Sequence, residues 1–130
     1  MVELISSSLQ TEEILQRGWF PALSNASIYL KFDGTISDTT TSNAVPAHTI
    51  ISMLSMTFAE RGGANELLNI RVLFGGSSTN YLVSTQSIPA WGTFIWNEPL
   101  VLHATDKMII NLDSAGNVDA QFHYIKQDWS

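Results

Sequence analysis

From residue 26 onward, apolar and polar residues alternate along the chain. Between residues 67 and 74 every second side chain is apolar, and Asn69 and Arg71 fall between them. Successive side chains of a β-strand point to opposite faces of its sheet, so this alternation predicts a strand with one buried face. The same alternation, apolar at even-numbered positions, predicts strands over residues 27–32, 107–112 and 118–125.

Residues 48–58 are apolar on both alternating phases. One phase holds Ile50, Leu54, Met56 and Phe58, and the other holds Ile51 and Met53. A strand that is covered by protein on both sides has this composition. The pattern therefore predicts a strand with two buried faces.

Turn-forming residues separate these segments. Gly75 to Asn80 is a strong hairpin loop, and three further strands are expected over residues 81–88, 93–96 and 100–102. About eight strands with turns about every 8 to 12 residues are typical of an antiparallel β-sandwich or jelly roll. We expect this all-β fold, as a single domain, over residues 26–130.

The first 25 residues differ from the rest and are expected to form an N-terminal arm. Thr11 to Arg17 is the only stretch with good helix formers, but it is too short for a stable isolated helix. The next four residues, Gly18 to Pro21, set two large aromatic side chains beside two helix breakers. We predict an extended or short helical arm that is ordered mainly by the surface it packs on.

Composition and charge exclude several functions. The 130 residues carry six scattered Lys and Arg and a net charge of −6, so neither nucleic acid nor an anionic membrane is an expected partner. The chain lacks cysteine, so its stability must come from packing or assembly. Its first nine residues do not resemble a secretory signal, and we expect no secretory export.

No group of residues has the spacing of a catalytic or metal site. His48, His103 and His123 lack a partner at ligand spacing, and Asp106, Asp113 and Asp119 fit turns or an outward strand face. A calcium loop at residues 113–117 would need more converging oxygens. We therefore expect no enzyme activity, no cofactor and no bound metal.

The large aromatic residues are the best candidates for a binding surface. Trp19 and Phe20 lie in the arm, whereas Trp91 and Trp96 lie at a turn and a strand edge. Exposed aromatic side chains concentrate at protein interfaces and sugar platforms. Trp19 and Phe20 are interpreted as interface residues; Trp91 and Trp96 fit an interface and a plug at the end of the sandwich equally well.

Several short segments between residues 45 and 125 together follow a known pattern. They are Val45-Pro46-Ala47, Thr49 to Ser52, Asn69 to Leu73, Ile88-Pro89-Ala90-x-Gly92-Thr93, Leu100 to Ile109, Ser114 to Ala120 and Tyr124-Ile125. These segments resemble small virion proteins of tailed bacteriophages, namely capsid decoration (cement) proteins and related neck or tail accessory subunits. The resemblance covers about two thirds of the chain. Trp91 and Ala104-Thr105 depart from the pattern, which has a small residue and Ala-Gly there.

The resemblance implies a jelly-roll subunit that forms a homotrimer and binds the major capsid protein on the capsid surface, after synthesis in the host bacterial cytoplasm. A neck or tail accessory subunit is the alternative within the virion. A carbohydrate-binding module is a third hypothesis, supported by the tryptophans and the polar loops.

Overall fold

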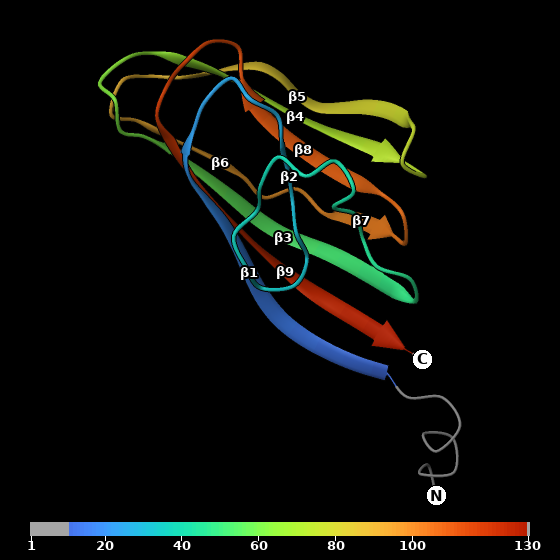
Figure 1. The fold of residues 1–130 in the computed structure, drawn as a ribbon. Coiled ribbons are helices and arrows are strands. Elements are labelled where there is room, and N and C mark those ends of the chain that lie inside the picture. Colours follow the sequence, from blue (N-terminus) through green and yellow to red (C-terminus); the bar gives the residue numbers. More distant parts are fainter. Residues whose placement is uncertain (1–10, 130) are drawn as a thin grey trace, which may run out of the picture.

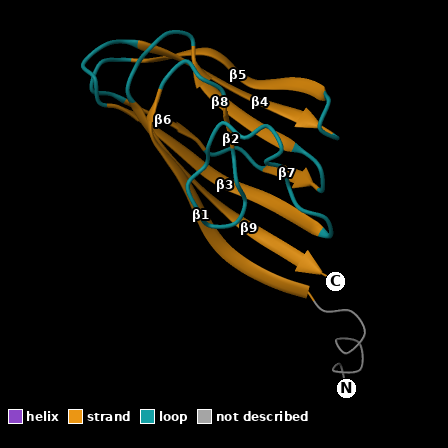
Figure 2. Ribbon diagram, in the orientation of Figure 1, coloured by secondary structure: helices purple, strands orange, loops and turns teal. Residues whose placement is uncertain are grey.

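The computed structural model describes residues 11–129, which consist of strands and loops without a helix (Figure 2). The strands form two sheets that lie face to face (Figure 1). Sheet A contains β1 (Thr11–Leu23), β9 (Val118–Trp129), β3 (Thr49–Glu60), β6 (Thr93–Trp96) and β7 (Leu100–His103). Sheet B contains β2 (Ile28–Tyr29), β8 (Lys107–Leu112), β4 (Glu66–Phe74) and β5 (Ser78–Ile88).

The strand order is that of a jelly roll. All pairs are antiparallel, and both β6 and β7 pair with β3, so the two short strands act as one interrupted strand. The pairs are therefore nested: β1 pairs with β9, β2 with β8, β3 with β6 and β7, and β4 with β5 in a hairpin. The predicted all-β sandwich or jelly roll is confirmed.

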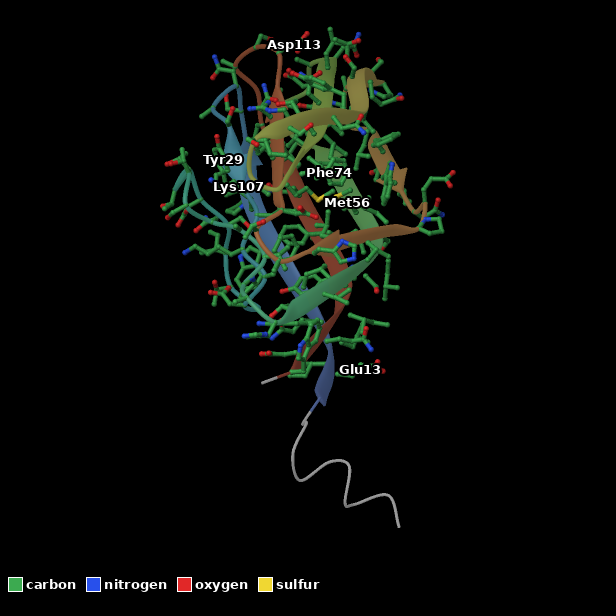
Figure 3. The ribbon with its side chains drawn as sticks, turned by 90° about the vertical axis from the view of Figure 1, so that its right-hand side faces the viewer. Glu13, Tyr29, Met56, Phe74, Lys107 and Asp113 are labelled. Atoms are coloured by element: carbon green, nitrogen blue, oxygen red, sulfur yellow. The ribbon has the colours of Figure 1, made fainter. Side chains whose placement is uncertain are left out.

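The buried core lies between the sheets and contains most of the residues that were expected to face inward. On β8 and β9 every predicted inward residue is buried, and so are Ile28, Leu30 and Phe32 around β2. Phe74 is an exception, because it ends β4 and is partly exposed. Figure 3 shows Met56 of β3 near the middle of the molecule.

Residues Thr11 to Arg17 do not form a helical turn; they belong to a 13-residue strand, β1. The register with β9 is continuous from Thr11, opposite Trp129, to Phe20, opposite Ala120. Pairing with a long neighbouring strand satisfies more backbone groups than a helix of this length could. Of the two conformations expected for the arm, the extended one is present, and residues 1–10 lie outside the described residues.

The inner face of β1 closes the core over β9. Gly18 lies opposite Phe122, whose ring occupies the space of the missing side chain: a Cβ on Gly18 would lie 2.3 Å from the ring. Two residues earlier, the hydroxyl of Tyr124 donates to Oε1 of Gln16 over 3.1 Å and accepts from the Gly34 amide. The described part of the arm is therefore an integral strand of sheet A.

β3 does not have two covered faces. A β-bulge at Leu54 interrupts its pairing with β9, between Met53 opposite Tyr124 and Ser55 opposite His123. The extra residue shifts the phase of alternation, so Met53 before the bulge and Met56 after it are both buried while Leu54 is exposed. Apolar residues on both phases of this segment come from the bulge, and the prediction of Leu54 beside Met56 was wrong.

Candidate protein-binding surface

The outer face of sheet A carries apolar side chains in register across all of its strands. One row across β1, β9, β3 and β7 consists of Leu15, Ile125, Ser52 and Val101. A second row across β1, β9, β3 and β6 consists of Trp19, Gln121, Thr57 and Ile95. Leu54, at the bulge, lies between the two rows.

Five large apolar side chains of this outer face are exposed, and we call them the apolar face: Leu15, Trp19, Leu54, Ile95 and Val101. The exposed fraction reaches 70% for Leu15 and 58% for Ile95. No helix of the described residues covers this side of the sheet. Polar residues such as Ser52, Thr57 and Gln121 lie between these apolar side chains in the rows. Five exposed large apolar side chains on one sheet face make this face the candidate site for another molecule.

The outer face of sheet B has a different character, since its side chains bind one another. Nδ2 of Asn69 donates to Oδ1 of Asp113 over 2.6 Å, and the Thr85 amide donates to Oδ1 of Asn69. The Arg71 guanidinium donates to Oδ1 of Asn111 and to the Ser27 hydroxyl. This face also exposes large apolar side chains, Leu67 and Tyr81, but fewer of them than the outer face of sheet A. Sheet A is therefore the candidate interface.

Trp91 projects from the turn between β5 and β6, where 73% of its surface is exposed. Its backbone φ is +62°, a left-handed conformation that an aromatic residue adopts only under strain. A buried carboxylate fixes this turn, because Oε1 of Glu60 accepts the Trp91 amide over 2.9 Å and also the Gly63 amide. The backbone N–H of Trp91, with those of Gly62 and Gly63, lowers the pKa of Glu60 against the opposing effect of burial.

The other predicted interface residues lie in two different environments. Trp19 belongs to the apolar face, whereas Phe20 and Trp96 are half-buried and pack against the core. Trp96 thus has the position of the core plug that the sequence allowed, and Trp91 does not. The register keeps Trp19 away from Ile95, with β9 and β3 between them.

The sequence did not single out four residues of the apolar face, namely Leu15, Leu54, Ile95 and Val101. Leu15, Ile95 and Val101 sit on the phase opposite to the inward positions of their strands, and this signal is visible in retrospect. Leu54 has no such signal, because in the sequence it shares the phase of the buried Met56 and Phe58. Reading that phase requires the strand register and the bulge, which only the structure supplies.

A pocket of about 290 Å³ opens beside Trp19, lined also by Arg17, Asp119 and Gln121. Its volume lies just below the roughly 300 to 1,000 Å³ of typical small-molecule sites. Both carboxylate oxygens of Asp119 already have partners: Oδ1 accepts a hydrogen bond from the Ala22 amide, and Oδ2 forms a salt bridge with Arg61 at 3.0 Å. Burial raises the pKa of Asp119, and these two contacts outweigh that effect and lower it.

The remaining polar candidates have structural partners. Asp106 is buried and accepts the amides of His103 and Gly75, which confirms the expectation of turn chemistry for His103 and Asp106. Asp113 pairs with Asn69 as described above. Within residues 11–129, no three His, Cys, Asp or Glu side chains are grouped so as to hold a metal ion. The described residues also contain no helix long and apolar enough to cross a membrane.

No protein-family model matches the chain, and no curated protein sequence matches it. Solved structures with a similar fold include the core of Drosophila NLP, a structure that bears on pentamer formation and histone binding by that protein. Its TM-score is 0.52 at 14% identity, over 88% of this chain and 95% of that one.

A phage capsid and a pilus are also among the similar solved structures. The capsid of Helicobacter pylori bacteriophage KHP30 has a TM-score of 0.48 at 11% identity, over 94% of this chain and 98% of the capsid chain. The disulfide-linked pili of Bacillus endospore appendages have a TM-score of 0.48 at 12% identity, over 92% and 89%. At 14% identity, the likeness to the NLP core concerns the fold alone.

Proposed function

We propose that the chain is a structural virion subunit without catalytic activity, a capsid decoration protein that binds and stabilises the lattice of the major capsid protein. The observation that carries this proposal is the apolar face of sheet A. A monomer gains nothing from five exposed large apolar side chains on one sheet face, whereas a subunit docked on a protein shell buries them.

Two further observations support an assembly role. The resemblance of residues 45–125 to phage decoration proteins implies a homotrimer on the capsid surface. Trp91, at one of the two departures from that pattern, is exposed on a strained turn that Glu60 fixes. An exposed aromatic side chain held on a strained turn is a candidate for a functional contact, so we assign Trp91 to contact with the shell.

A neck or tail accessory subunit has the same physical requirements and remains the alternative within the virion. Copy number separates the two roles. Quantitative mass spectrometry of purified virions is expected to give hundreds of copies per particle for a decoration protein, whereas tens or fewer would contradict decoration and favour the neck or tail.

The apolar face can be tested directly by substitution. Ile95→Asp places a charge on this face and is expected to weaken binding to capsids by at least about tenfold, since a charge would have to be desolvated on docking. Leu67→Asp is the matched control, because Leu67 is similarly exposed but belongs to sheet B. Both variants should melt close to the wild type, and cosedimentation with capsids that lack the protein measures the difference. Equal binding by the two variants would contradict a role for sheet A.

A carbohydrate-binding module makes a different prediction for Trp91. Binding of the isolated protein to a glycan array, abolished by Trp91→Ala, would replace the virion proposal. For this role the described residues supply the largely exposed indole of Trp91, with no second aromatic side chain in contact with it.

A test of the N-terminal arm requires a truncation shorter than the predicted arm of residues 1–25. Removing residues 1–20 would take away most of β1 and uncover Phe122 and Tyr124. Removing residues 1–10 leaves the described fold complete and tests whether the first residues contribute to binding.

A further inference from the structure

β1 has one edge that no described residue pairs with over most of its length. On the other edge it pairs with β9. At Trp19 the free edge is closed, where the Ser37 amide donates to the Trp19 carbonyl over 3.0 Å and Ile36 forms a bridge. The carbonyl of Trp19 therefore points away from β9. Since every second residue of a strand points the same way, the amides and carbonyls of Arg17, Leu15 and Glu13 also point to the free edge.

This part of β1 lacks most of the features that protect a free edge. Proteins usually block such edges with proline, charged side chains (lysine above all), a bulge or a covering loop. Residues 11–18 contain neither proline nor lysine, and the bulge of β1 comes later, between Phe20 and Leu23. Leu15 is exposed on the outer face and Ile14 is exposed on the neighbouring position. The edge is thus a regular template for another strand, provided that the partner complements its charged residues.

The charges beside Leu15 indicate which strand fits. Glu13 and Arg17 lie two residues before and two residues after Leu15, on the same outer face, and both are exposed. Neither has a salt bridge within residues 11–129. Oε2 of Glu13 accepts a hydrogen bond from Gln127, which leaves Oε1 without a partner there. Figure 3 shows Glu13 at the end of β1, far from Asp113 at the opposite end of the molecule.

We propose that two copies of the chain pair through this edge, antiparallel and centred on Leu15. Leu15 then lies opposite Leu15 of the second copy, and each Glu13 lies opposite an Arg17. The three opposed pairs are hydrogen-bonded ones, because their amides and carbonyls all point to the shared edge. Opposite charges across two strands and an apolar pair between them stabilise the contact together.

Other arrangements of the same two strands lack this fit. A shift by two residues in either direction sets a charged side chain opposite Leu15 and breaks both ion pairs. An in-register parallel pair would oppose Glu13 with Glu13 and Arg17 with Arg17, and like charges in direct opposition are unfavourable. A two-fold axis through Leu15 therefore matches the sequence of this edge best.

The paired copies form one continuous sheet from the two A sheets, with the two apolar faces on the same side. This contact depends only on β1, so it holds whether the assembled protein decorates a capsid or binds elsewhere. It can also join two trimers, since a two-fold contact at β1 leaves the far edge of sheet A free.

The absence of cysteine allows a test by site-specific crosslinking of the full chain. Opposed residues of a hydrogen-bonded antiparallel pair have Cα atoms about 5.5 Å apart, within the roughly 4.4 to 6.8 Å that a disulfide spans. Leu15→Cys is expected to form, under mild oxidation, a covalent dimer of twice the 14.3 kDa chain mass. Leu67→Cys, at an exposed position on sheet B away from this edge, is the control and should stay uncrosslinked. A Leu15→Cys protein that stays monomeric under these conditions would overturn the proposal.

The register has its own test. Glu13→Cys and Arg17→Cys should each crosslink poorly alone and efficiently when mixed, because residue 13 of one copy meets residue 17 of the other. Glu13→Arg should weaken association about tenfold, because arginine at position 13 of each copy would then face Arg17 of the other copy. Light scattering of the protein as it elutes from a sizing column measures the change. Adding Arg17→Glu should restore association. Equal weakening by the single and the double variant would refute the ion pairs, and loss of capsid binding without loss of the dimer would count only against the proposed function.

Discussion

Two of the non-glycine residues with a positive φ lie at the positions where the chain departs from the phage pattern; Ala22, His48 and Thr85 also have a positive φ. Thr105 has a φ of +74° and Trp91 a φ of +62°. Side chains with a Cβ resist this region, and branching at Cβ increases the cost. The resemblance has glycine at the first position and a small residue at the second, which is what these backbone angles favour.

Thr105→Gly is therefore expected to stabilise the protein. Glycine adopts a positive φ without strain, so the free energy of unfolding should rise by about 1 kcal/mol despite the greater freedom of glycine in the unfolded chain. Chemical denaturation measures the change, with Thr93→Gly, on strand β6, as a control that should be destabilised. A loss of stability in Thr105→Gly would show that the Thr105 side chain compensates for the strain.

Glu60 and Glu66 are buried neighbours whose pKa values move in opposite directions. The pKa of Glu60 falls, chiefly because it accepts the Trp91 amide. Burial raises the pKa of Glu66, as does the negative charge of Glu60, and Oε1 of Glu66 has no hydrogen-bond partner. Glu60 thus stabilises the fold above the usual carboxyl pKa of 4.5, and this effect is lost as the pH falls through the lowered pKa of Glu60 in the folded state. Glu66 favours folding at low pH, and it opposes folding above its raised pKa.

Glu66→Gln should accordingly raise the melting temperature at pH 7, and the gain should shrink as the pH falls toward 4. Glu60→Gln should lower the melting temperature at pH 7, because three backbone amides lose a charged acceptor, and this loss should also shrink toward pH 4. Thermal unfolding followed from pH 4 to pH 8 compares both variants with the wild type. A Glu66→Gln variant less stable than the wild type at pH 7 would contradict this account of Glu66.

At the scale of a single element, the bulge of β3 decides which side chains the strand buries. Leu54→Ser should change the free energy of unfolding by less than about 0.5 kcal/mol, because Leu54 is exposed. Met56→Ala should cost about 2 to 5 kcal/mol, because Met56 is fully buried. Urea denaturation separates the two, and similar losses for both would mean that Leu54 shares the face of Met56 in solution.

Strands β3 and β1 show what the sequence could and could not predict. Strict alternation identified the buried faces of β4, β8 and β9, because each of these core faces follows a period of two without interruption. The bulge left no signature of its own, since Leu54 is as apolar as its buried neighbours. β1 was missed as a strand because its inward positions are Gln16 and Gly18, neither of them apolar, and their partners lie about a hundred residues away in the sequence.

The candidate surface was predictable only in part for a related reason. Aromatic content pointed to Trp19 and Trp91, both exposed, but also to Phe20 and Trp96, which pack on the core. The aliphatic residues of the apolar face became visible only through the register of four strands. A surface that forms across strands is a property of their pairing, and no single segment contains it.

At the scale of the whole molecule, the jelly roll places the two ends of the described chain side by side, and Thr11 pairs with Trp129 (Figure 1). Among the described residues, β9 is the only strand that pairs with β1 over most of its length, so β1 lacks this partner until β9 has been made. During synthesis both edges of β1 therefore stay unpaired until β9 has been made. Contacts this distant in sequence close slowly. While β1 is unpaired on both sides, a strand of another chain can take the place of β9. The yield of native protein should therefore depend on the concentration of nascent chains more than the stability of the finished fold would suggest.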